Sequence, residues 1–123
     1  MKLQFLSPAL HGVLDYLAAG ALIVLPVVLG LSGVALWLSI AGGVGLIVYS
    51  LLTDYRFGVV RLISFNLHLL LDVAAAVGFI VAAIALKFDA FTSTYYFVMA
   101  GGVIAVVLAS ERAAHGRTVS SPA

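Results

Sequence analysis

Two histidine–aspartate pairs are the residues in this chain best suited to chemistry. His11 precedes Asp15 by four positions, and His68 precedes Asp72 by the same spacing. In a helix, residues four positions apart lie on one face, so each histidine can hydrogen-bond its own aspartate. Imidazole and carboxylate groups are ligands for zinc, non-haem iron and manganese, and metal sites in helical bundles use this spacing. The spacing indicates a candidate polar or ligand cluster of four residues.

Three interpretations of these pairs are open. The first is a structural clamp, in which hydrogen bonds hold two membrane helices together. The second is a binding or proton-handling site, either for a metal ion or, with the two histidines as axial ligands, for haem. The third is direct catalysis. For metal binding, no motif beyond the spacing adds support. We expect no cofactor and no enzymatic activity, and the sequence leaves the identity of any metal unknown.

A secondary group of candidates follows two of the apolar segments. Asp54 and Glu111 stand 57 positions apart, and Arg56 lies two positions beyond Asp54. In an arrangement of membrane helices, these residues return to the same end as the two pairs. We therefore expect two histidines and up to four carboxylates at one mouth of a bundle, partly neutralised by nearby arginines.

The composition requires lipid rather than water around most of the chain. Of the 123 residues, 64% are hydrophobic and 9% are charged, and the formal net charge is +1. A soluble domain of this size needs a larger polar surface. The near-neutral charge lacks the basic patch that nucleic acid demands. The absence of cysteine excludes disulfides and thiolate metal sites.

Four apolar segments are each long enough to cross a bilayer, near residues 9–29, 34–52, 62–86 and 93–110. They lack the alternation of a membrane barrel, and an open sheet would leave backbone groups unpaired in lipid. We predict an all-α membrane protein with four transmembrane helices in a single domain over 1–123. The polar tail over 113–123 is expected to be frayed.

An internal repeat relates the two halves of the chain. Shifting the sequence by 57 positions places both members of the first pair on those of the second, and Ser7 on Ser64. The repeat predicts two parallel two-helix units, 7–56 and 64–112, related by an axis along the membrane normal. Parallel units place the two histidines at one depth and the two aspartates at another.

Basic residues are concentrated at one end of this arrangement, because all except Lys87 fall near the termini or in the central loop. The positive-inside rule then places both termini and the central loop in the cytoplasm. We expect a multi-pass protein of the bacterial inner membrane. Its expected partners are the lipid bilayer and either a membrane-protein partner or a second copy, but no nucleic acid.

Two further patterns concern packing. Small residues recur at every fourth position over 35–43, which favours close contact between helices of the same chain. Tyr95 and Tyr96 are expected near the non-cytoplasmic surface, where aromatic side chains anchor a protein at the membrane interface.

Several motifs give the chain a family resemblance. They are Ser7-Pro8-x2-His11-Gly12-x2-Asp15-Tyr16, Pro26-Val27-Val28-Leu29-Gly30, Leu51-Leu52-Thr53-Asp54-Tyr55 and Leu67-His68-x3-Asp72. Together they resemble the bacterial SPW-repeat membrane proteins, which are built from tandem two-helix units and named for a Ser-Pro-Trp motif. That triplet reads Leu25-Pro26-Val27 in the first unit and Ala82-Ala83-Ile84 in the second. The resemblance covers 7–111 and implies a four-helix integral membrane protein, without an activity or a cofactor.

The sequence favours a non-enzymatic role. Little chain is left outside the four expected helices to form a surface for soluble substrates, which suits a structural or accessory subunit of a membrane assembly. The alternative is a cofactor-, metal- or proton-binding membrane protein that uses a symmetric His/Asp cluster at the cytoplasmic side.

Overall fold

The computed structural model describes residues 5–110, in which all regular secondary structure is helical. The helices are α1 (Pro8–Val28), α2 (Gly33–Leu51), α3 (Phe65–Ala85) and α4 (Ala90–Ala109). Each is long and apolar enough to cross a membrane, because 20 residues extend about 30 Å. The predicted four-helix membrane fold is confirmed at this level. The predicted frayed tail, 113–123, and Glu111 lie outside the described residues.

Capping side chains set where three of the helices begin. The hydroxyls of Ser7 and Ser64 each accept a hydrogen bond from the backbone N–H three residues further on, at 3.2 and 3.1 Å. Asp89 does the same for Thr92 at 2.7 Å, and this bond lowers the pKa of the exposed Asp89 carboxyl. Consequently α3 begins later and α4 earlier than the hydropathy pattern predicts, and Thr92 lies in the first turn of α4.

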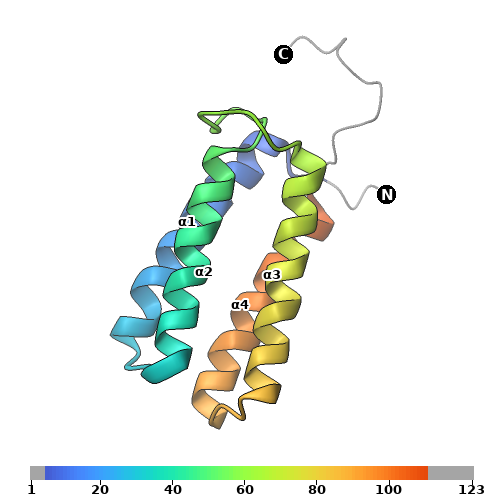
Figure 1. Ribbon diagram of the computed structural model, residues 1–123. Helices are drawn as coiled ribbons and strands as arrows, with labels where there is room; N and C mark the ends of the chain where they lie inside the picture. Colours follow the sequence, from blue (N-terminus) through green and yellow to red (C-terminus); the bar gives the residue numbers. More distant parts are fainter. Residues whose placement is uncertain (1–4, 111–123) are drawn as a thin grey trace.

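The four helices form two antiparallel hairpins, α1 with α2 and α3 with α4, which stand side by side (Figure 1). Within the first hairpin, Gly43 lets α2 approach α1 closely. A Cβ atom at this position would lie 2.8 Å from the carbonyl oxygen of Ala19 and 2.7 Å from Cγ1 of Ile23. One turn away, Ser39 donates a hydrogen bond to the Leu22 carbonyl at 2.8 Å. The small-residue row of α2 therefore packs within the chain.

The two hairpins are tied together at the end that carries the α1–α2 and α3–α4 turns. The hydroxyl of Tyr95 donates to Ser39 Oγ, which is already a donor to a carbonyl, and that of Tyr96 donates to the Ala35 carbonyl, both at 2.6 Å. Both tyrosines of α4 are buried. Their interpretation as lipid-interface anchors is wrong, because their hydroxyls bond the neighbouring hairpin instead of the membrane surface.

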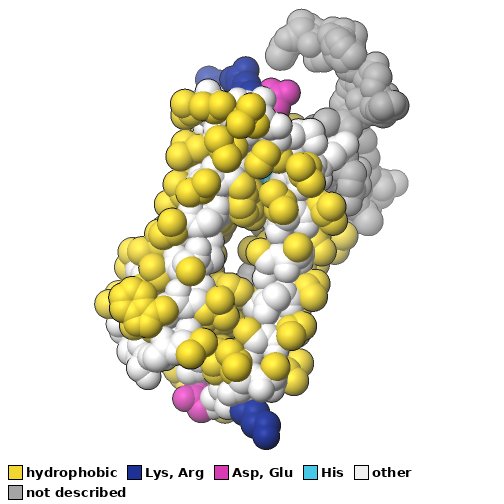
Figure 2. Space-filling model, in the orientation of Figure 1, with side chains coloured by type: hydrophobic (Ala, Val, Ile, Leu, Met, Phe, Trp, Pro, Cys, Tyr) yellow, Lys and Arg dark blue, Asp and Glu magenta, His cyan; other side chains and the backbone are white. Residues whose placement is uncertain are grey.

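Backbone contacts join the hairpins at the opposite end. The N–H of Leu6 donates to the Ala109 carbonyl at 2.8 Å, and the N–H of Asp54 donates to the Ile63 carbonyl at 2.6 Å. Between the two ends the hairpins separate, and Figure 2 shows a hollow at mid-height of the molecule. The ends of the bundle thus hold it together, while its middle is open.

The close approach at Gly43 generates the first prediction. Gly43→Ala should lower the free energy of unfolding by about 1–3 kcal/mol, because the added methyl group has no room. Unfolding of the detergent-solubilised protein by sodium dodecyl sulfate, followed by circular dichroism, measures this change. Gly45→Ala is the matched control, because its Cβ meets no atom within 4 Å, and helix propensity alone should make it neutral or stabilising. An equal change in unfolding free energy in Gly43→Ala and Gly45→Ala would contradict the close packing of α2 against α1 at Gly43.

Candidate functional site

Four buried side chains from two hairpins converge at the end of the bundle that carries the α2–α3 loop. His11 and Asp15 come from α1, and His68 and Asp72 come from α3. His11 Nε2 lies 3.1 Å from Asp15 Oδ1 and 3.0 Å from Asp72 Oδ2. His68 Nε2 lies 2.6 Å from Asp15 Oδ2 and 3.4 Å from Asp72 Oδ2. Each histidine therefore contacts the carboxylates of both hairpins, and we call these four residues the His/Asp cluster.

Two hydroxyl groups fix the orientation of the imidazole rings. His11 Nδ1 lies 2.6 Å from Ser110 Oγ, and His68 Nδ1 lies 2.7 Å from Thr53 Oγ1. Each hydroxyl donates its single proton to the backbone carbonyl four residues earlier, at 2.6 Å. Each must therefore accept its second hydrogen bond, so that the imidazole Nδ1 carries a proton. Both Nε2 atoms are consequently directed at the carboxylates.

The geometry between Nε2 and the carboxylates is unusual at one contact. His68 Nε2 and Asp15 Oδ2 lie 2.6 Å apart, yet within the described part of the chain neither atom has a partner in hydrogen-bonding geometry. One ligand atom from each of the four residues lies within 4.8 Å of the others. Two buried carboxylates within this group need two compensating positive charges. Either a proton on each imidazole Nε2 or one divalent cation can supply them.

Aromatic rings close the cluster on the side of the α2–α3 loop. The ring of Phe65 stands edge-on to His11, with 5.2 Å between centroids, and the ring of Tyr55 lies 5.5 Å from His68. Gly12 permits this cover, because a Cβ atom there would lie 2.9 Å from the Tyr55 ring. Burial raises the pKa of the Tyr55 phenol, which keeps this cover uncharged. The cluster lies at one mouth of the bundle, and aromatic side chains cover it on this side.

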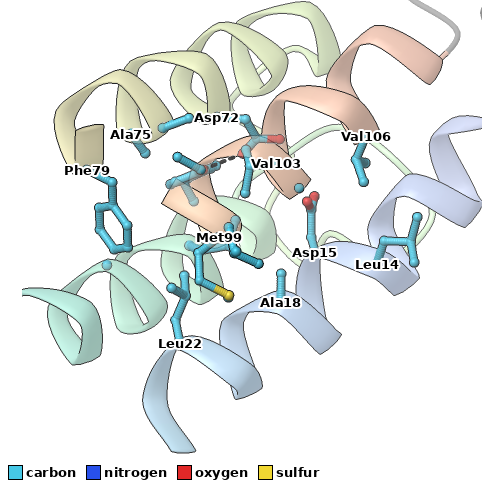
Figure 3. A pocket seen from close by; sticks show the side chains of 17 residues that line it. Leu14, Asp15, Ala18, Leu22, Asp72, Ala75, Phe79, Met99, Val103 and Val106 are labelled. Carbon is cyan, nitrogen blue, oxygen red and sulfur yellow. Dashed lines mark hydrogen bonds between the residues drawn. The ribbon is translucent and has the colours of Figure 1, made fainter. Parts of the chain in front are cut away.

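The carboxylates instead line a cavity that runs between the hairpins. Its volume is about 370 Å³, and residues of all four helices form its mainly apolar wall. Figure 3 shows Asp15 and Asp72 at one end of it, and Phe79, Met99 and Leu22 further along. The hydroxyl of Tyr49, which also lines the cavity, donates a hydrogen bond to Asp72 Oδ1.

The two secondary candidates within the described residues, Asp54 and Arg56, do not join the cluster. Asp54 is exposed and contributes its backbone N–H to the bond with Ile63, and Arg56 is exposed with its guanidinium 5.9 Å from the Phe57 ring. Glu111 is outside the described residues. Among those described, the candidate metal-ligating group contains two carboxylates, not four.

Sequence reasoning missed three residues that support the cluster: Tyr49, Thr53 and Ser110. A signal existed for two of them, because Thr53 and Ser110 are 57 positions apart, as the two histidines are. No signal pointed to Tyr49, which stands among apolar residues of α2.

Comparisons with protein-family models, with curated proteins and with solved structures found no match to this chain. Its function is therefore inferred from the geometry of the His/Asp cluster.

The hydroxyl contacts generate the second prediction. Thr53→Val should cost about 1–3 kcal/mol of unfolding free energy, because it leaves the buried Nδ1–H of His68 without an acceptor. In nitrogen-15 NMR of histidine-labelled protein, the imidazole chemical shifts of His68 should change, whereas those of His11 should not. Thr94→Val is the matched control, since this exposed threonine also donates to a carbonyl four residues earlier but contacts no histidine. An unchanged His68 spectrum in Thr53→Val would contradict the assigned tautomer.

Proposed function

We propose that this protein is a small integral membrane protein that binds one divalent metal ion in the His/Asp cluster. The observation that carries the proposal is the contact between His68 Nε2 and Asp15 Oδ2, two buried atoms 2.6 Å apart without a hydrogen bond. When His68 is neutral with its proton on Nδ1, these two atoms present lone pairs to each other, and a cation bound by both replaces that repulsion with two coordination bonds. The proposal thereby accounts for a geometry that a purely hydrogen-bonded cluster leaves unsatisfied.

The ligand set restricts the metal. Two imidazole nitrogens and two carboxylate oxygens suit zinc, iron(II) or manganese(II), whereas copper(I) prefers sulfur ligands. One divalent ion also neutralises Asp15 and Asp72 completely, which matters because an uncompensated charge is costly inside a membrane. The hydroxyls of Thr53 and Ser110 act as outer-shell partners, which commonly orient histidine ligands of metal sites.

Haem does not fit this arrangement. Two axial histidines must stand on opposite faces of a porphyrin, with nothing else between them. Here the ring centroids of His11 and His68 are 5.4 Å apart, and both carboxylates lie against both Nε2 atoms. The space that a macrocycle would need is filled by Asp15 and Asp72.

The experiment is a metal titration of the detergent-purified protein after chelation. We expect one equivalent of zinc or cobalt(II) per chain, and cobalt(II) should give visible absorption bands of a four-coordinate site. His68→Ala should weaken binding by more than the roughly 10–100-fold loss that follows removal of an outer-shell partner. Asp54→Asn is the control, because this carboxylate lies outside the cluster.

Two outcomes would contradict the metal site: binding that is equally weakened in Asp54→Asn, or a wild-type protein that binds no divalent ion. The second outcome would favour the other role of the cluster, a clamp without metal.

The clamp is the second candidate function, and it would suit a non-enzymatic structural or accessory subunit of a membrane assembly. The observation that favours it is the crossed pairing, in which His11 contacts Asp72 and His68 contacts Asp15. These contacts join the two hairpins, and replacing both histidines by alanine would then release one hairpin from the other without affecting any ligand.

Further features of the fold are part of this proposal. Contacts made by one hairpin recur in the other at positions 57 apart: His11 with Ser110 and His68 with Thr53. The bridges of Leu6 with Ser110 and of Ile63 with Thr53 follow the same offset. These correspondences support a duplicated, parallel two-helix unit. The bacterial SPW-repeat membership, the inner-membrane location and the cytoplasmic termini rest on the sequence.

A further inference from the structure

The cavity between the hairpins is held open by the fold. At one end the His/Asp cluster ties α1 to α3, and at the other Tyr95 and Tyr96 of α4 bond the backbone and side chains of α2. Both ties are buried, and they set the spacing of the two hairpins at either end of the cavity. Its volume of about 370 Å³ lies within the range of roughly 300–1,000 Å³ that small-molecule pockets occupy.

The cavity is reached from the bilayer. Its wall includes Val98, of which 63% is exposed, and the exposed Gly102, both on the membrane-spanning part of α4. Figure 2 shows the hollow between the hairpins on the apolar surface of the molecule. The opposite route, from the α2–α3 loop, is covered by Tyr55 and Phe65. A molecule that enters must therefore already be dissolved in the membrane.

The polar end of the cavity selects the chemistry of the occupant. Asp15 and Asp72 are hydrogen-bond acceptors in the wall, and Asp15 Oδ2 has no hydrogen-bond donor among the described residues. The cluster is neutral overall with either two protons or one divalent ion, so a charged head group would introduce an unbalanced charge. A neutral hydroxyl can donate to a carboxylate in either state.

We infer that the cavity between the hairpins binds a neutral, bilayer-dissolved alcohol, with its hydroxyl at Asp15 and Asp72 and its apolar body between Phe79 and Met99. This goes beyond metal binding and does not depend on it. The mostly apolar wall with a few convergent polar groups is the usual construction of a small-molecule site.

The test uses a long-chain alcohol that carries a diazirine on its chain, applied to the protein in lipid nanodiscs and activated by light. We expect saturable labelling of residues of the cavity wall, prevented by an excess of plain decanol. Gly102→Leu should abolish this labelling by filling the cavity. Gly101→Leu, whose added Cβ atom also meets no atom within 4 Å but which does not line the cavity, should label as the wild type does.

A second pair of variants keeps the test decisive if Gly102→Leu fails to fold. Ala75→Leu fills the cavity from α3, while the neighbouring exposed Ala74 lies outside its wall and supplies the control Ala74→Leu. Unaltered labelling in a folded cavity-filling variant would overturn the inference. Equal labelling by the methyl ether of the probe would overturn the role of the hydroxyl. The cavity would then bind the alkyl chain alone.

Metal content measured on the same samples separates this inference from the metal site. Gly102→Leu should keep its metal while losing the alcohol. A wild-type protein that binds the alcohol but no metal would overturn the proposed function and support the cavity assignment. A protein that binds metal but shows no saturable labelling would support the metal site and overturn the cavity assignment.

Discussion

The constraint on which this structure depends is the burial of two carboxylates within membrane-spanning helices. On insertion scales a charged side chain at the middle of a membrane helix costs about 2.5–3.5 kcal/mol, and the cost falls when the charge is paired. Asp15 and Asp72 meet this condition only together, because each lies between the histidines of both hairpins. Moving one hairpin away would leave a histidine and an aspartate on each side with half of their contacts. The cluster therefore fixes the distance between the hairpins.

The cavity is a consequence of the same arrangement. In lipid there is no hydrophobic force that brings helices together, so they associate through close packing and polar contacts. Within the first hairpin, Gly43 provides close packing against Ala19. Between the hairpins, polar contacts at the two ends provide much of the association, Phe79 of α3 packs closely against Gly42 of α2, and the cavity remains beside this contact. An apolar space in a membrane protein can be filled by a membrane-dissolved molecule at little cost, whereas water would enter it unfavourably.

The sequence was sufficient for the four spans and for the convergence of His11, Asp15, His68 and Asp72 as a hypothesis, since hydropathy and a spacing of four are local properties of a helix. It was insufficient for contacts that depend on how helices are rotated against one another. The crossed contacts of His11 with Asp72, the approach of Tyr49 and the exposure of Asp54 belong to this second kind. Tyr95 and Tyr96 were misassigned for the same reason, because an aromatic residue near a helix end can face lipid or a neighbouring helix with the same sequence pattern.

The orientation of the histidines links occupancy of the cluster to closure of the bundle. Because Thr53 and Ser110 hold both Nδ1 protons, both Nε2 atoms face the centre, where the two hairpins meet. Any cation bound there is shared by residues of α1 and α3, and it binds the closed bundle more tightly than the separated hairpins. By thermodynamic linkage, whatever neutralises the cluster also stabilises the contact between the hairpins. The clamp and the metal site therefore use the same coupling between the hairpins, and they differ in whether protons or a divalent ion supply the positive charge.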